Sequence, residues 1–149
     1  MNGTAGDLTG SSEGLLVEDH DPVSGYSAVF DDDGKTAYAY LSDGKRIVAD
    51  VWLYNRGESP DDPEWDDPGK MPFANPKGYA NGELFPPVAD PSQLRFEWAL
   101  GAVGPTLRIF IRGEAFGVLT PGSKPGWSKL ALANGPLALK LEEAPPDES

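Results

Sequence analysis

Residues 26–55 read YSAVFDDDGKTAYAYLSDGKRIVADVWLYN, which is three runs of alternating side chains separated by two Asp-Gly pairs. A strand turns successive side chains to opposite faces, so an alternation of period two predicts strands rather than helices. Glycine reaches positive φ without steric cost and aspartate tolerates it, so Asp33-Gly34 and Asp43-Gly44 predict tight turns. The stretch therefore predicts a three-stranded antiparallel meander over residues 25–55.

The third and longest run places a charge in the middle of a strand. By alternation, Asp50 shares one face with Trp52 and Tyr54, and a covered charge is costly unless it has a partner. Two interpretations stay open. Asp50 either faces solvent or pairs with an arginine such as Arg46 or Arg108, or it belongs with the two aromatic residues to a surface that accepts a basic side chain.

The same stretch resembles a small bacterial family of unknown function. That family is characterised by an FEDDG-type turn, matched here by Phe30–Gly34, and by a strand ending in an apolar residue, Tyr and Asn, matched by Trp52–Asn55. Residues 107–119 (LRIFIRGEAFGVL) match more loosely, and Asp31 stands where the family has Glu. The resemblance implies a compact, β-rich bacterial protein and supplies no catalytic residue.

Outside the meander, further alternating runs predict short strands. They lie at 14–18, 94–98, 107–112, 115–119, 127–133 and 137–141. A helix capped by Ser92 is the alternative for the second of them, but its apolar spacing argues against a helix. We expect a mainly β fold of about eight or nine short antiparallel strands, arranged as a sandwich or a partly open barrel. Residues 14–142 should form one domain, while residues 1–13 and the acidic tail 143–149 should be disordered.

Residues 56–92 form a long connection that carries eight of the 15 prolines, too many for regular elements to persist. A truly disordered linker is normally poor in large apolar groups, yet this segment contains several. They are Trp65, Met71, Phe73, Tyr79, Leu84 and Phe85. We therefore expect the segment to lie against the sheet, held there by these side chains.

The net charge of −12 argues against partners that are themselves polyanions. Nucleic acids and anionic membrane surfaces both demand Lys and Arg. Solubility alone is one explanation of the charge, and a surface that steers a basic protein partner is the other. For such a partner we predict a binding surface made of Asp50, Trp52 and Tyr54 together with the acid-rich part of 56–92. The latter residues are Asp61, Asp62, Glu64, Trp65, Asp66 and Asp67.

Few residues point to catalysis or to a bound cofactor. The chain has one histidine, His20, in a polar turn, and no cysteine, so a Ser-His-acid triad would have to use His20 and an ordinary zinc site lacks its ligands. The acid-rich run 61–69 lacks the alternating acids and central glycine of a calcium loop. We predict no metal, no cofactor and no catalytic residue.

Three functional hypotheses remain. The first is a non-enzymatic, acidic binding protein of bacterial origin, for example an immunity-type protein for a basic partner. The second is a carboxylate-dependent enzyme of glycoside-hydrolase type with 56–92 as a lid, because the separation of two acids is a spatial quantity. The third is a structural domain of a homo-oligomer. Residues 1–14 lack a basic start and an apolar core, so we expect no signal peptide and a cytoplasmic location.

Overall fold

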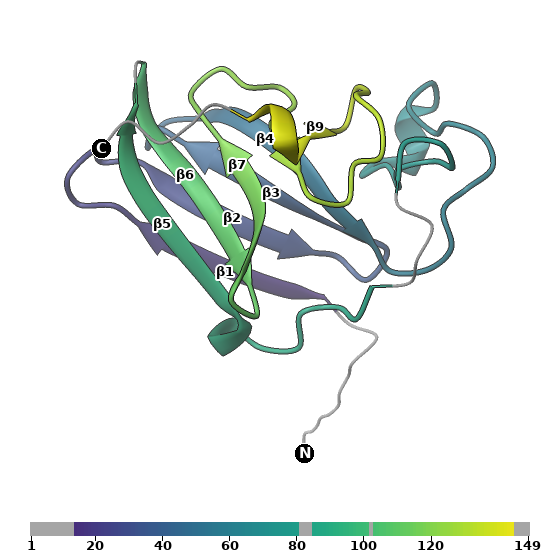
Figure 1. The fold of residues 1–149 in the computed structure, drawn as a ribbon, viewed down its shortest axis with the longest axis horizontal. Helices are drawn as coiled ribbons and strands as arrows, with labels where there is room; N and C mark the ends of the chain where they lie inside the picture. Colours follow the sequence, from purple (N-terminus) through teal and green to yellow (C-terminus); the bar gives the residue numbers. More distant parts are fainter. Residues whose placement is uncertain (1–13, 81–84, 102, 145–149) are drawn as a thin grey trace.

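The computed structural model describes residues 14–80, 85–101 and 103–144, which form two stacked β-sheets. The first sheet has the order β1-β2-β3-β4, with β1 (Leu15–His20), β2 (Ser27–Asp32), β3 (Thr36–Ser42) and β4 (Ile47–Asn55). The second has the order β5-β6-β7-β8-β9, with β5 (Leu94–Gly101), β6 (Gly104–Ile111), β7 (Glu114–Leu119), β8 (Trp127–Ser128) and β9 (Leu139–Lys140). Three 3₁₀ turns, η2 (Pro68–Lys70), η3 (Pro91–Gln93) and η4 (Leu141–Glu143), lie in the connections. Figure 1 shows β5, β6 and β7 in front of the first sheet, so the predicted mainly β sandwich is confirmed and neither sheet closes into a barrel.

The predicted meander is confirmed, and its turns form where the Asp-Gly pairs stand. Asp33 Oδ1 accepts from the backbone N–H of Lys35 at 2.9 Å, and Asp43 Oδ1 accepts from that of Lys45 at 2.9 Å. The glycines that follow have φ of 96° (Gly34) and 99° (Gly44), the region that other residues avoid. Local turn chemistry therefore determines where the chain reverses between β2, β3 and β4.

One prediction about the meander is wrong, because β4 contains a bulge at Leu53. Tyr38 pairs with Trp52 and Ala37 with Tyr54, so Leu53 is an extra residue in β4. An extra residue reverses the side-chain alternation beyond it. Tyr54 consequently points between the sheets, where its ring lies 6.3 Å from that of Phe30, and it does not share a face with Asp50 and Trp52.

The second sheet matches the expected strands at 94–98, 107–112 and 115–119, and 94–98 is a strand rather than a helix. The predicted extended run at 127–133 is too long, because only Trp127–Ser128 forms a strand. After Ser128 the chain turns and pairs with a distant segment instead: the backbone N–H of Leu132 donates to the carbonyl of Tyr79 at 2.7 Å. β8 and β9 also pair in parallel, an exception to the all-antiparallel expectation.

The predicted ends of the domain are tested only in part. Residues 1–13 and 145–149, expected to be disordered, lie outside the described residues. Glu143 and Ala144, assigned by prediction to the acidic tail, are described. Glu143 ends η4 and its Oε1 accepts from Asn134 Nδ2 at 3.0 Å.

The core lies between the two sheets and contains side chains from both. Its largest fully buried members outside β4 are Phe30, Leu41, Leu107, Ile109, Ile111, Phe116, Val118 and Leu119. The sheets approach closely at Gly117, where an added Cβ would lie 2.9 Å from Leu53 Cδ2. Burying side chains of this size contributes roughly 1.5–3 kcal/mol each, which is the main stabilisation of the sandwich.

Residues 56–92 are called the flap from here on, and its described residues, 56–80 and 85–92, lie against the sheets as predicted. The flap forms the right-hand end of the molecule in Figure 1, and hydrogen bonds attach its backbone to the first sheet. Tyr38 Oη donates to the carbonyl of Phe73 at 2.7 Å, and Asn55 Nδ2 donates to that of Asn75 at 2.9 Å. Trp65, Phe73 and Phe85 pack against the core, whereas Met71 is 64% exposed; Leu84 lies outside the described residues.

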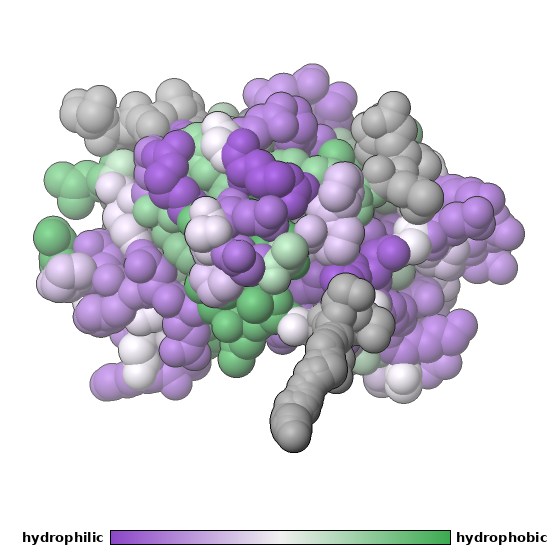
Figure 2. Space-filling model, turned by 90° about the horizontal axis from the view of Figure 1, so that it is seen from below, coloured by the Kyte–Doolittle hydropathy of each residue, from purple (hydrophilic) through white to green (hydrophobic). Residues whose placement is uncertain are grey.

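The two open sides of the sandwich differ. Beside β4, the segment between β7 and β9 supplies backbone partners: Gly122 N donates to Val48 O, and Gly126 N donates to Asp50 O. On the other side β1 and β5 are linked by the indole N–H of Trp98, which donates to Asp19 Oδ2 at 2.8 Å. Figure 2 views the molecule from below and shows the flap end as predominantly hydrophilic. Among the described residues, no helix has the length and apolar character needed to cross a membrane.

Candidate functional site

The candidate site is a groove on the outer face of the first sheet, beside the middle of β3 and β4. Its volume is about 270 Å³. We call it the Asp50 groove; its lining residues are Tyr38, Tyr40, Asp50, Met71, Pro72, Phe73, Pro136 and Leu137. Residues from the sheet, the flap and the segment before β9 meet here, so the groove exists only in the folded chain.

The strand pairing of the meander places the polar groups of the groove. Tyr40 stands directly opposite Asp50 on the neighbouring strand. Tyr38 lies two residues away on the same face of β3, and the two tyrosine rings stack with centroids 6.1 Å apart and planes 12° apart. Since Tyr38 Oη already donates to Phe73 O, the flap covers one tyrosine and leaves the other at the mouth of the groove.

The Asp50 carboxylate is half-buried, and in the described part of the chain no hydrogen bond or ion pair reaches it. Burial raises the pKa of the Asp50 carboxyl, and the nearby charge of Lys124 lowers it by a smaller amount. The sequence suggested Arg46 or Arg108 as a partner of Asp50, but the charge that acts on its carboxylate is that of Lys124. A half-buried carboxylate without a donor from the protein has acceptor capacity that only water or a ligand can use.

Further carboxylates make the outer face of the first sheet negative. Burial and the charges of Asp33 and Asp32 raise the pKa of Asp31. Burial, together with Asp31, Asp50 and Asp33, raises the pKa of Tyr40 to about 12. Burial is the larger cause of both shifts, and the smaller part that comes from the neighbouring carboxylates reflects a negative local field, which favours a cation.

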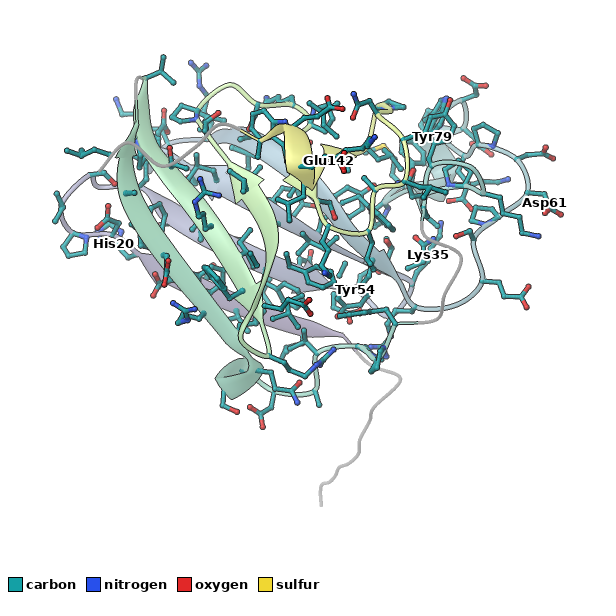
Figure 3. The ribbon with its side chains drawn as sticks, viewed as in Figure 1. His20, Lys35, Tyr54, Asp61, Tyr79 and Glu142 are labelled. Atoms are coloured by element: carbon teal, nitrogen blue, oxygen red, sulfur yellow. The ribbon has the colours of Figure 1, made fainter. Side chains whose placement is uncertain are left out.

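Two of the predicted site residues cannot reach a partner. Trp52 is 1% exposed and Tyr54 is 0% exposed, so the expectation that they form a surface with Asp50 is wrong. The indole N–H of Trp52 donates to Asn55 Oδ1 at 2.9 Å, under the flap. Tyr54 lies between the sheets near the centre of the molecule (Figure 3).

Three of the residues that carry the family resemblance, Asp32, Gly34 and Tyr54, belong instead to one largely buried network. Asp32, whose side chain is 0% exposed, accepts at Oδ2 from Tyr54 Oη at 2.7 Å and from Arg56 Nη1 at 3.0 Å. Its Oδ1 accepts from Gly34 N at 2.9 Å, and Tyr54 Oη accepts from the flap at Val88 N at 3.0 Å. The motif thus joins the turn, β4 and the flap, which is a structural role.

The acid-rich part of the flap does not line the groove, and three of its residues have partners close by. Asp61 pairs with Lys77 at 2.8 Å, and Glu64 with Lys35 at 2.9 Å. Trp65 packs edge-on against Tyr79 with ring centroids 5.4 Å apart. Figure 3 places Asp61, Tyr79 and Lys35 together at the flap end.

The remaining acids of the flap have simple surroundings. Asp67 caps η2 by accepting from Gly69 N at 3.0 Å. Asp62 and Asp66 are exposed. None of the predicted flap residues lines the Asp50 groove, so the structure divides the predicted surface into two parts.

Catalytic groups do not gather in the described residues. His20 lies at the opposite end of the molecule from Asp61 and Tyr79 (Figure 3), and its Nδ1 is 3.0 Å from Ser27 Oγ. A larger hollow of about 430 Å³ contains Glu58 and Glu64, but it also contains Lys35, which pairs with Glu64. Among the described residues no group of three His, Cys, Asp or Glu side chains is arranged to hold a metal ion. A glycoside hydrolase needs two facing carboxylates, and the Asp50 groove has one.

Sequence reasoning identified Asp50 and missed the other seven described residues of the groove, as well as the neighbouring Lys124. The spacing of Tyr38 and Tyr40 placed both on one face of the predicted strand, which was the available signal. No protein-family model matches this chain, and searches of curated proteins and of solved structures also find no match. The resemblance to a bacterial family stays a prediction, and the functional conclusion has to come from the groove itself.

Proposed function

We propose that this chain is a non-enzymatic, acidic binding protein that takes a basic side chain of a protein partner into the Asp50 groove. An immunity-type protein that holds a basic partner inactive is one form of this function. The proposal includes a bacterial origin and a cytoplasmic location, both of which are predictions from the sequence.

The observation that carries the proposal is the Asp50 carboxylate, half-buried in an aromatic groove without a hydrogen-bond donor or ion-pair partner among the described residues. Partial burial disfavours the ionised form of this carboxylate, because no donor from the protein compensates for the water that it has lost. A cation from a partner would supply the missing donors, and the tyrosine rings would add cation–π attraction. The groove therefore gains most from a positively charged occupant.

The charge of the whole molecule supports the same conclusion. A net charge of −12 speeds the encounter with a basic protein by long-range attraction. The acid-rich flap end contributes to that field even though its residues lie outside the groove. Because exposed charges are screened by salt, the encounter should weaken as ionic strength rises.

Affinity capture from a bacterial lysate tests the proposal. Immobilised wild-type protein should retain a basic protein at low salt and release it at high salt, and Asp50→Asn should retain much less of it. Glu142→Gln is the matched control, because it removes the same charge from an exposed residue of η4. Asp62→Asn measures the contribution of the flap acids.

Two results would contradict the proposal. The first is that no basic protein is retained at low salt and released at high salt. The second is that Asp50→Asn and Glu142→Gln retain the same amount, which would leave long-range charge without a role for the groove.

A further inference from the structure

The groove also restricts which cation it can hold, an inference that rests on the function proposed above. Five of its eight lining residues are apolar: Met71, Pro72, Phe73, Pro136 and Leu137. A lysine side chain has four methylenes that pack along apolar surface while its ammonium reaches a polar group. The apolar walls therefore match the stem, and Asp50 matches the charge.

The number of side-chain acceptors favours an ammonium over a guanidinium. The groove offers four side-chain acceptor oxygens: the two carboxylate oxygens of Asp50 and the hydroxyl oxygens of Tyr40 and Tyr38, the last of which gives its own proton to Phe73 O and can still accept. An ammonium carries three N–H donors and a guanidinium five. Since each buried donor without an acceptor costs about 1–3 kcal/mol, four acceptor oxygens are enough for lysine and too few for all five donors of arginine.

The fold already places one lysine next to Asp50. The segment 120–126 bonds to both sides of Asp50 on β4: Asp50 N donates to Ser123 O at 3.1 Å, and Gly126 N donates to Asp50 O at 2.8 Å. Lys124 lies between these two contacts in sequence and is exposed, and its charge acts on the Asp50 carboxylate. An incoming cation consequently meets a like charge at the groove.

We propose that the Asp50 groove binds a lysine side chain of the partner, and that Lys124 is the internal cation against which this lysine competes. The incoming ammonium contacts Asp50 and Tyr40, and its stem lies along Phe73 and Leu137. Lys124 keeps its place on the loop but is pushed toward solvent by the like charge.

Affinity for lysine should depend on pH through Asp50. Its pKa is raised by burial, so affinity is constant at neutral pH and falls as the pH drops through that raised value. The other titratable or charged groups whose charges act on this region are Tyr38, Tyr40, Asp31, Asp33, Glu64 and Lys124. The two tyrosines stay neutral in this range because their pKa values are raised.

The test is an NMR titration of the full chain with three pentapeptides, Gly-Gly-X-Gly-Gly, in which X is lysine, arginine or norleucine. We expect the lysine peptide to shift the signals of Tyr40 and Met71, the arginine peptide to bind more weakly, and the norleucine peptide to have no effect. Asp50→Asn should lower the affinity for the lysine peptide at least tenfold, about 1.4 kcal/mol. Lys124→Met should raise it about two- to fivefold, as expected for removing one exposed like charge.

The possible failures are distinguishable. Arginine binding as tightly as lysine would overturn this inference and leave the proposed function intact. An unchanged or lower affinity in Lys124→Met, in a variant whose spectrum shows it to be folded, would also overturn the inference. If neither basic peptide shifts Tyr40, both the inference and the proposed role of the groove are wrong.

Discussion

Asp32 is the middle one of three consecutive aspartates, and replacing it with alanine should destabilise the fold strongly. Its side chain is 0% exposed and accepts from Tyr54 Oη, Arg56 Nη1 and Gly34 N at 2.7, 3.0 and 2.9 Å. The side chain of Arg56 is itself only 12% exposed. Removing one partner of a buried ion pair costs about 3–5 kcal/mol, which would be a large share of the stability of a domain of this size.

The two neighbouring aspartates provide matched controls with the same change of composition. Asp31 lies on the outer face, where burial and repulsion from the other aspartates raise its pKa; Asp31→Ala should change stability by no more than about 0.5 kcal/mol. Asp33 accepts from Lys35 N and Thr36 N in the exposed turn, so Asp33→Ala should cost about 1 kcal/mol.

Urea denaturation of the three variants at neutral pH measures these differences directly. Amide exchange at Val88 adds a local readout, because Val88 N donates to Tyr54 Oη and should lose protection first in Asp32→Ala. If Asp32→Ala costs no more than Asp33→Ala, the network is not the link between the meander and the flap, and the structural role assigned to the motif is wrong.

Two further perturbations test the flap and the loop beside Asp50. Lys35 Nζ donates to Glu64 Oε1 and to Lys70 O, both at 2.9 Å, so Lys35→Met should cost about 0.5–1 kcal/mol and speed amide exchange at Ala74, which donates to the same carboxylate. Burial raises the pKa of Glu64, but the hydrogen bonds from Lys35 and Ala74 lower it more. The ionised Glu64 side chain therefore stabilises the fold above its unfolded pKa of 4.5, and this stabilisation is lost as the pH falls through the lower folded value. A stability–pH profile of Lys35→Met should show a smaller loss over the same interval. Gly126→Ala would bring a Cβ to 2.4 Å from Val118 O and should cost about 1–3 kcal/mol in urea denaturation, whereas Gly57→Ala, with open space around it, should be neutral.

The sequence predicts the sandwich because its turns and alternation are local signals. The Asp-Gly pairs specify where β2, β3 and β4 reverse, and period two assigns most side chains to the correct face. The alternation failed at Leu53, since a bulge arises from the fit of one strand against its neighbour and leaves no mark in the pattern itself. Tyr54 was therefore assigned to the wrong face.

The candidate site was harder to predict because it is built from distant segments. Asp50 was recognised as an unusual charge in a strand, but Phe73 and Leu137 reach it only through the path of the flap and of the segment before β9. The high density of acidic residues led to the prediction of a binding surface at 61–67. The carboxylates there are exposed to water or paired with nearby groups, and they do not mark a binding site. An isolated, half-buried charge is the stronger indication of a site, and it requires the structure to be seen.

The effect of Asp50→Asn on stability separates a binding site from a structural carboxylate. Burial raises the pKa of Asp50, which means that ionisation of this side chain is less favourable in the folded chain than in the unfolded chain. The free energy of unfolding therefore declines as the pH rises from the unfolded pKa of 3.8 to the higher folded pKa. Asparagine has no such penalty, and we expect Asp50→Asn to stabilise the protein at pH 7 by no more than about 0.5 kcal/mol, because solvent screens a half-exposed charge, while it weakens lysine binding. Urea denaturation at pH 7 and below pH 3.8 measures this, and the gain should vanish at the lower pH. A variant that loses binding and stability together would show that Asp50 holds the fold, and the groove would then have no claim to be a functional site.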